Sequence, residues 1–353
     1  MLVVVEHFRL LELLPEDAAL AYYSHEAVIA FFVLSGAVIA HAAGRPNTSL
    51  RDFAIARAVR ICSVTLPAIG FAYLMASCFY SDGGNAPILG TDPALLSAEA
   101  WYTLFTTAFF LNESWFIWNE AVWNGPYWSL CYEVWYYVIF ACAWFSKTRV
   151  RWLLAGLACL LAGPRIIMLL PVWLLGTWFK RFAGRIPARP LAGLLIAVST
   201  LVAIAWIGSG DLELHAWNAI HARLPQLWIL QSSSFFLTDY LVALLFLVNF
   251  IGVQMCRVWI GKFLARGRAQ VRWLAASTFS IYLFHYPMVL ALVATVDRSR
   301  LTLLMSVVML VAVIIACILL SFVTERRKDT LGTLVRRWLG DKSRCNRRER
   351  SNA

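Results

Sequence analysis

Three ionisable side chains lie within apolar stretches, where they could do chemistry. His7 lies in the run MLVVVEHF, Glu133 in YWSLCYEVWYY and His285 in SIYLFHYP. Imidazole acts as a general base or a nucleophile near neutral pH, and a carboxylate at membrane depth needs a partner, water or a cavity. A histidine in such a setting also serves as a hydrogen-bonding partner between helices. The three residues are therefore candidates for acid–base or nucleophilic chemistry, or for polar contacts within a helix bundle.

Small and cationic side chains interrupt the apolar pattern at two further places. Ser35 and Gly36 divide the run FFVLSGAVIA, where they could serve a polar site or allow two helices to pack closely. Arg57 and Arg60 follow in the segment ARAVRI. Because guanidinium binds phosphate bidentately, this pair could hold a phosphorylated ligand. Each arginine could equally anchor the cytoplasmic end of a membrane span.

The elements that carry these residues are predicted to be membrane helices. The chain has 353 residues, of which 61% are hydrophobic and 14% charged, against about 45–50% and about 25% in an ordinary soluble domain. A soluble core of this size cannot bury so much apolar surface. The composition excludes a water-soluble enzyme, a disulfide-stapled secreted module and a disordered chain. It predicts an all-α, polytopic transmembrane helix bundle.

About ten apolar segments are candidates for spans, since a helix needs about 20 residues to cross a bilayer. They lie at 1–14, 25–43, 61–80, 127–146, 151–163, 165–179, 190–208, 234–252, 273–296 and 300–323. A further apolar stretch, 101–112, is too short to cross and is predicted to be re-entrant or interfacial. We expect a transmembrane domain over 1–324 and a basic cytoplasmic tail over 325–353.

The positive charges predict the orientation of these spans. With both termini in the cytoplasm, 26 of the 31 lysines and arginines lie on the inner side, as the positive-inside rule requires. The inner segments are 41–60, 146–153, 180–190, 253–273 and the tail from 325. We expect the tail to contact anionic lipid headgroups rather than nucleic acid. The predicted location is the plasma (inner) membrane, crossed several times.

Four motifs occur in one order across almost the whole chain. They are FFVLSG, the RxxR of ARAVRI, the WSLxxE of YWSLCYEVWYY and the YLxHxP-like part of SIYLFHYP. Together they resemble the acyltransferase 3 family, integral membrane enzymes that O-acylate cell-envelope and extracellular carbohydrates. The VTER sequence at 323–326 is similar to the family's usual end of its last span. The resemblance implies a ten-helix fold, a cytoplasmic acyl-CoA donor (acetyl-CoA by default), a sugar hydroxyl as acceptor on the far side of the membrane, and no bound cofactor or metal.

The resemblance also assigns roles to individual residues. His7 matches the family's histidine and is implied to act as base or nucleophile, while Glu133 would orient the imidazole or activate the sugar. Arg57 and Arg60 would dock the phosphates of CoA. The remaining expected substrate contacts are Ser35, Trp128, Ser129 and His285. Ser129 and Glu133 are four residues apart and share a helix face, so we expect Glu133 to line a polar cavity within about 8 Å of His7 or His285.

Two departures from the family pattern leave alternatives open. The family places an arginine about eleven residues before its histidine, a position that falls before Met1, so the first span is expected to lack its N-terminal part. The family also usually places its proline sooner after the arginine and isoleucine than RICSVTLP does. An inactive truncated acyltransferase is therefore one alternative. A polysaccharide or small-molecule transporter without chemistry is another, although the Gly/Pro-interrupted segments in matched halves that are typical of transporters are absent.

Overall fold

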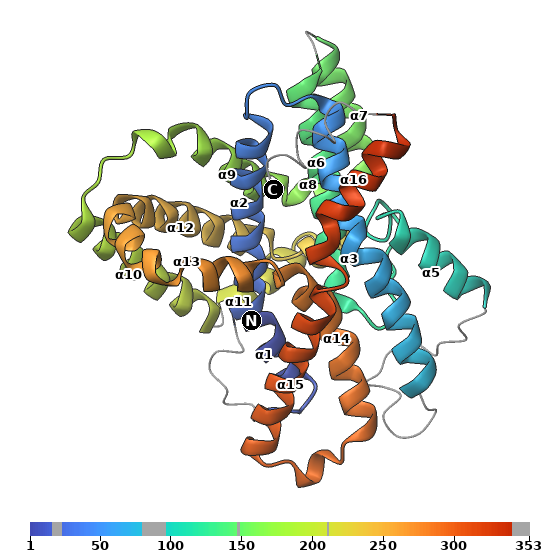
Figure 1. Cartoon of the computed structure of the whole chain (residues 1–353). Coiled ribbons are helices and arrows are strands. Elements are labelled where there is room, and N and C mark those ends of the chain that lie inside the picture. The colour runs from blue at the N-terminus through green and yellow to red at the C-terminus, as the bar shows by residue number, and fades with distance from the viewer. Residues whose placement is uncertain (16–22, 80–96, 147–148, 210–211, 341–353) are drawn as a thin grey trace.

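Helices form the regular structure of this protein. The computed structural model describes residues 1–15, 23–79, 97–146, 149–209 and 212–340, and no strand occurs within them (Figure 1). The helices are α1 (Leu2–Leu10), α2 (Ser24–Ala43), α3 (Leu50–Phe79), α5 (Ala98–Ala108), α6 (Trp128–Phe145), α7 (Val150–Ala162), α8 (Pro164–Met168), α9 (Leu170–Phe182), α10 (Pro190–Ser209), α11 (Leu212–His221), α12 (Phe236–Met255), α13 (Arg257–Ala275), α14 (Thr278–Thr295), α15 (Leu303–Ser321) and α16 (Lys328–Trp338). The predicted all-α class is confirmed.

Six of the described helices are long and apolar enough to cross a membrane. They are α2, α3, α10, α12, α14 and α15. The other four predicted spans also form helices, α1, α6, α7 and α9, which do not meet both conditions. The count of ten spans and the cytoplasmic position of both termini therefore stay predictions. Residue 80, at the end of one predicted span, and residues 341–353 of the predicted tail lie outside the described residues.

α3 begins earlier than the apolar pattern predicts, at Leu50 rather than at 61. A reciprocal cap explains the start: the backbone N–H of Asp52 donates to the Ser49 hydroxyl at 3.1 Å, and the Asp52 carboxylate accepts from Ser49. Such a capping box satisfies backbone donors that a helix start leaves open. As a result, Arg57 and Arg60 lie within α3, three residues apart, and not in a loop.

α2 and α9 approach each other through two glycines. A Cβ atom on Gly36 would lie 2.0 Å from the carbonyl oxygen of Trp173, and one on Gly176 would lie 1.8 Å from the carbonyl oxygen of Val33. No side chain larger than hydrogen fits at such distances. The structure therefore shows the close helix packing that was one interpretation of the Ser35-Gly36 pair. The same approach places Ser35 beside Trp173, whose indole Nε1 donates to the Ser35 hydroxyl at 3.3 Å.

We expect Gly36→Ala to reduce the yield of folded, membrane-inserted protein several-fold. The added methyl group would meet backbone of α9, which cannot rotate away, and overpacking of this kind costs about 1–3 kcal/mol or more. The measurement is thermal unfolding in detergent, followed by size-exclusion chromatography. Gly156→Ala on α7 is the matched control, since no atom lies within 4 Å of its added Cβ. Equal melting temperatures for the two variants would mean that α2 and α9 do not depend on this contact.

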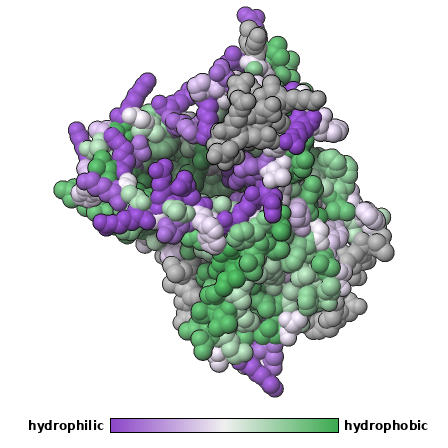
Figure 2. All heavy atoms as spheres, viewed as in Figure 1, coloured by the Kyte–Doolittle hydropathy of each residue, from purple (hydrophilic) through white to green (hydrophobic). Residues whose placement is uncertain are grey.

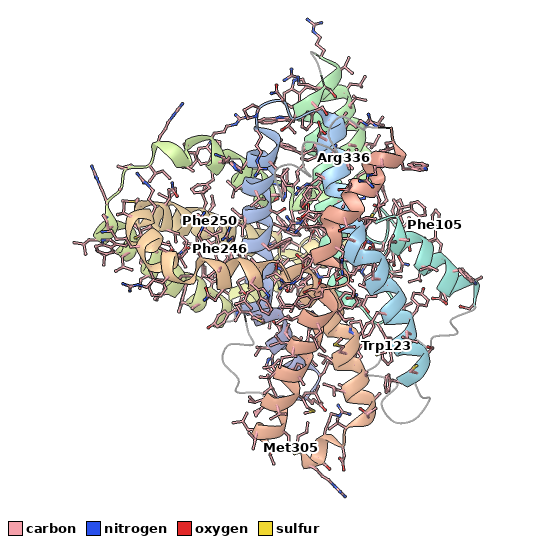
Figure 3. The ribbon with its side chains drawn as sticks, in the orientation of Figure 1. Phe105, Trp123, Phe246, Phe250, Met305 and Arg336 are labelled. Atoms are coloured by element: carbon pink, nitrogen blue, oxygen red, sulfur yellow. The ribbon has the colours of Figure 1, made fainter. Side chains whose placement is uncertain are left out.

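The surface divides into apolar and hydrophilic regions. Exposed apolar side chains lie on the outside of the bundle, among them Phe105 of α5 and Met305 of α15 (Figure 3). Figure 2 shows a mainly apolar surface over α14 and α15, and hydrophilic residues over α13 and around a hollow next to it. Large apolar patches on a soluble protein would promote association, whereas lipid covers them on a membrane protein. Most of α13, a helix with five basic residues and no buried side chain, lies in the expected inner segment 253–273.

Candidate active site

Two histidines from opposite ends of the chain form a hydrogen-bonded pair. α1 carries His7 and α14 carries His285, and the two helices pack against each other. Nδ1 of His7 lies 2.8 Å from Nε2 of His285, and the stacked rings have centroids 5.1 Å apart. His285 is fully buried and His7 is partly exposed. Two of the residues singled out by sequence therefore belong to one site.

The hydrogen-bond partners assign the protons of this pair. Nδ1 of His285 lies 2.9 Å from the carbonyl oxygen of Ile281, which can only accept, so this nitrogen carries the proton. Nε2 of a neutral His285 must then accept from Nδ1–H of His7. Nε2 of His7 is left with its lone pair, and no described residue donates to it. The buried His285 thus holds the His7 ring in the tautomer that a general base requires.

Glu133 is buried and held by hydroxyl groups from two helices. Its Oε1 atom accepts from Ser35 Oγ of α2 at 2.7 Å and from the Tyr137 hydroxyl one turn further along α6. Ser35 in turn accepts from Trp173 of α9. Both hydrogen bonds end on Oε1. No hydrogen bond from a described residue reaches Oε2, which can therefore accept from a ligand or water. No described hydrogen bond joins Glu133 to a histidine, and its approach to within about 8 Å of an imidazole stays a prediction.

A cavity of about 220 Å³ lies beside Glu133. Its polar wall comes from α3, α6 and α14, through Arg60, Ser129, Glu133 and Tyr282. The Ser129 hydroxyl lies 2.6 Å from the Tyr282 hydroxyl, which donates to the carbonyl oxygen of Pro126 at 2.8 Å. The ring of Tyr282 lies 6.3 Å from that of His285. Tyr282 therefore lines the cavity and lies next to His285, whereas neither His7 nor His285 lines the cavity itself. The cavity has room for several waters of about 30 Å³ each.

The two arginines of the RxxR motif face different cavities. Arg57 lines a basic pocket of about 460 Å³ at the ends of α2 and α3, whereas Arg60 lines the cavity of Glu133. A third pocket, apolar and of about 260 Å³, is lined by Arg57, Ile61 and Tyr137. Arg57 is shared with the basic pocket and Ile61 with the cavity of Glu133. The three spaces are therefore neighbours along α3.

Trp128 has a different environment from the other expected substrate contacts. Its ring packs edge-to-face against Tyr132 at 5.2 Å and against Phe32 at 6.2 Å. It is not among the residues that line the cavity of Glu133. The contacts described for Trp128 are therefore those of aromatic packing between α2 and α6.

Sequence reasoning missed three side chains at the site: Tyr137, Trp173 and Tyr282. Tyr137 follows Glu133 by four residues and Tyr282 precedes His285 by three, so helix periodicity could have found both. Trp173 had no such signal, because it reaches Ser35 from α9, far away in sequence.

The loop between α5 and α6 buries a further carboxyl group that sequence reasoning did not select. Glu113 is 3% exposed, and burial raises its pKa to about 7, while the nearby Arg165 opposes the shift. Glu113 lines none of the three cavities described above. Within the part of the chain that the structure describes, no group of three or more His, Cys, Asp or Glu side chains could hold a metal ion.

The fold and the site define a multi-helix membrane protein whose polar groups converge inside the bundle. A comparison with family models matches residues 5–326 to an acyltransferase domain. Because this match covers most of the chain, the protein belongs to the acyltransferase 3 family that its motifs indicated. Comparisons with curated proteins and with solved structures gave no match. Family membership supports a multi-pass membrane acyltransferase in general terms.

Proposed function

We propose that this protein transfers an acyl group, acetyl by default, from cytoplasmic acyl-CoA to a hydroxyl of an envelope or exported carbohydrate. The observation that carries the proposal is the His7–His285 pair, which leaves a lone pair on Nε2 of His7 inside a domain of the acyltransferase 3 family. The acyl-CoA is a substrate, and no bound cofactor takes part. The protein acts in the plasma (inner) membrane, in contact with lipid.

In the proposed reaction His7 is the general base. Its Nε2 takes the proton of the sugar hydroxyl as the oxygen attacks the thioester carbonyl. The C–S bond then breaks, and the protonated His7 returns the proton to the departing thiolate, which gives the sugar ester and CoA. His285 is a positioning residue, because it keeps Nδ1–H of His7 hydrogen-bonded and Nε2 free.

Glu133 and the arginines have binding roles in this proposal. The Oε2 atom of Glu133 accepts a hydrogen bond from the acceptor sugar, while Oε1 stays fixed by Ser35 and Tyr137. Arg57 faces the basic pocket and suits the phosphates of CoA. The neighbouring cavities support a donor that enters from the cytoplasm and extends toward Glu133.

The test is a transfer assay with the purified protein in proteoliposomes. Acetyl-CoA labelled in the acetyl group is supplied on the cytoplasmic side, and alkali-labile label is measured on added glycan acceptors. The proposal requires label on the glycan that depends on His7. Movement of unmodified glycan across the membrane without ester formation would identify a transporter instead. Absence of both, with well-folded protein, would favour an acyltransferase without activity.

We expect Arg57→Ala to raise the KM for acyl-CoA about tenfold, with a smaller effect on the KM for the glycan. Arg60→Ala, which alters the cavity of Glu133, should affect the KM for the glycan more than the KM for acyl-CoA. Loss of a charge-assisted contact to phosphate weakens donor binding by about 1.5–3 kcal/mol. A tenfold rise in KM corresponds to the lower end of this range. The measurement is initial-rate kinetics with each substrate varied in turn. Arg189→Ala, an exposed cytoplasmic arginine before α10, is the control. An unchanged KM for acyl-CoA in Arg57→Ala would mean that Arg57 does not bind the donor.

A further inference from the structure

The last described helix forms part of the basic pocket although it lies outside the family match. The matched residues end at 326, and α16 follows from Lys328 to Trp338. α16 packs against α3, with Gly332 near Val59. Its Arg336 lines the basic pocket together with Arg45 and Arg57. One wall of this pocket is therefore supplied by a segment that the family domain does not include.

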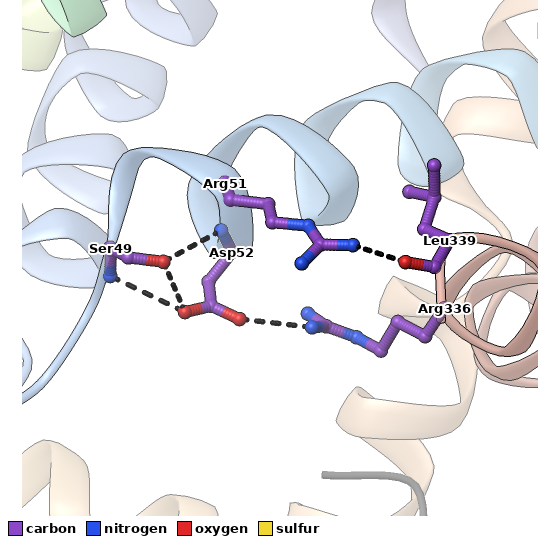
Figure 4. A network of polar contacts seen from close by, with 5 residues as sticks. All are labelled: Ser49, Arg51, Asp52, Arg336 and Leu339. Carbon is purple, nitrogen blue, oxygen red and sulfur yellow. Dashed lines mark hydrogen bonds and ion pairs between the residues drawn. The ribbon is translucent and has the colours of Figure 1, made fainter. Parts of the chain in front are cut away.

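Polar contacts fix α16 to the start of α3 (Figure 4). Nη1 of Arg336 lies 2.9 Å from Oδ1 of Asp52, and the Arg51 guanidinium donates to the carbonyl oxygen of Leu339 at 2.7 Å. The Asp52 carboxylate is itself held by Ser49. The side chains of Arg336 and Asp52 are only 11% and 15% exposed, so water screens this ion pair less than one on the open surface. The network keeps Arg336 at the wall of the pocket.

The pocket carries more positive than negative charge. Three guanidinium groups and one carboxylate line it. Nε and Nη1 of Arg57 are buried and have no hydrogen-bond partner within the described residues. These N–H groups are not exposed to the pocket, but Arg57 lines it, and the positive charge of its guanidinium favours an anion there through the short-range Coulomb attraction. Phosphate is one of the anions that guanidinium groups bind through paired hydrogen bonds.

We propose that Arg45, Arg57 and Arg336 form a site for the phosphate groups of the acyl donor, with α16, which lies beyond the family match, as one wall. This inference rests on the proposed function, because acyl-CoA is the ligand that carries the phosphates. A volume of about 460 Å³ lies within the range of small-molecule pockets. The adjoining apolar pocket, which shares Phe53 and Arg57, takes the thioester arm toward Tyr137. Asp52 acts as a positioning residue that orients Arg336.

The test measures binding without turnover. The full-length protein in phosphatidylcholine nanodiscs is titrated with CoA, and the Kd is determined for wild type, Arg336→Gln and Arg337→Gln. We expect a Kd at least tenfold higher for Arg336→Gln. Arg337 is the matched control, since this neighbouring arginine is exposed and does not line the pocket, and its variant should bind CoA as wild type does. Arg45→Gln, at an exposed position after α2, should weaken binding in the same way, which keeps the test valid if Arg336→Gln unfolds.

A phosphate could also come from a lipid headgroup, and a second set of nanodiscs that contain phosphatidylglycerol separates the two sources. If Arg336→Gln and Arg45→Gln bind CoA as wild type does but retain less phosphatidylglycerol, the pocket is a lipid site and the proposal is overturned. Unchanged CoA binding in both variants, with an active wild type, also overturns it and leaves the proposed function standing. A wild type that neither binds CoA nor transfers acetyl would instead refute the proposed function itself.

Discussion

Replacement of His7 by alanine is expected to lower the rate of acyl transfer about 10²–10⁴-fold, the usual effect of losing a general base. The expected loss falls mainly on kcat, because His7 acts on the reacting hydroxyl and not on the CoA phosphates. His285→Ala should also lower kcat, since Nδ1–H of His7 then loses its acceptor and the ring is free to turn. If the two residues act as a unit, the double variant should be little slower than His7→Ala alone.

The measurement is initial-rate transfer of labelled acetyl at equal levels of membrane-inserted protein. His41→Ala is the control, because His41 is an exposed histidine near the end of α2 and lies in neither the histidine pair nor any of the cavities. More than about half of the wild-type rate in His7→Ala would remove His7 from the mechanism. Strictly additive effects of the His7 and His285 substitutions would mean that the hydrogen bond between them does not matter for catalysis.

Apolar composition predicted the helices well, because burial in lipid and helix formation demand the same residues. Each of the ten expected spans overlaps a described helix, and the stretch 101–112 overlaps the short helix α5. The apolar pattern did not predict the helical segments that are rich in charged residues. α3 extends over the charged residues from Leu50, where a capping box and not hydrophobicity decides its start, and α13 and α16 carry many charges on amphipathic surfaces.

The site was predictable in its residue types but not in its pairing. His7, Ser35, Glu133 and His285 stand out because polar groups are rare at membrane depth, yet their order in the chain does not say which of them touch. The structure pairs His7 with His285 and Ser35 with Glu133. Such contacts depend on how distant helices cross, as at Gly36 and Gly176, and a single sequence carries little information on that geometry.

Glu133→Gln is expected to lower acyl transfer about 10²-fold or more with little loss of stability. Glutamine keeps the shape of the side chain and an oxygen that can accept from Ser35 and Tyr137, but it loses the charge that strengthens the hydrogen bond to the acceptor sugar. Glu133→Leu should do more damage, because it leaves the buried hydroxyls of Ser35 and Tyr137 without their acceptor, at a cost of about 1–3 kcal/mol each. The two variants therefore separate chemistry from packing.

Transfer rates and thermal unfolding are measured on the same detergent-purified samples, with Glu99→Gln as the control. Glu99 is an exposed carboxylate in the first turn of α5, so its substitution should change neither quantity. A Glu133→Gln variant that is fully active, beside a Glu133→Leu variant that is unstable, would reduce Glu133 to a polar contact between α2 and α6. The opposite outcome, an inactive glutamine variant that melts close to the wild-type temperature, would require the carboxylate charge itself. Since the described hydroxyls occupy only Oε1, that charge would be available at Oε2, where the acceptor sugar is proposed to bind.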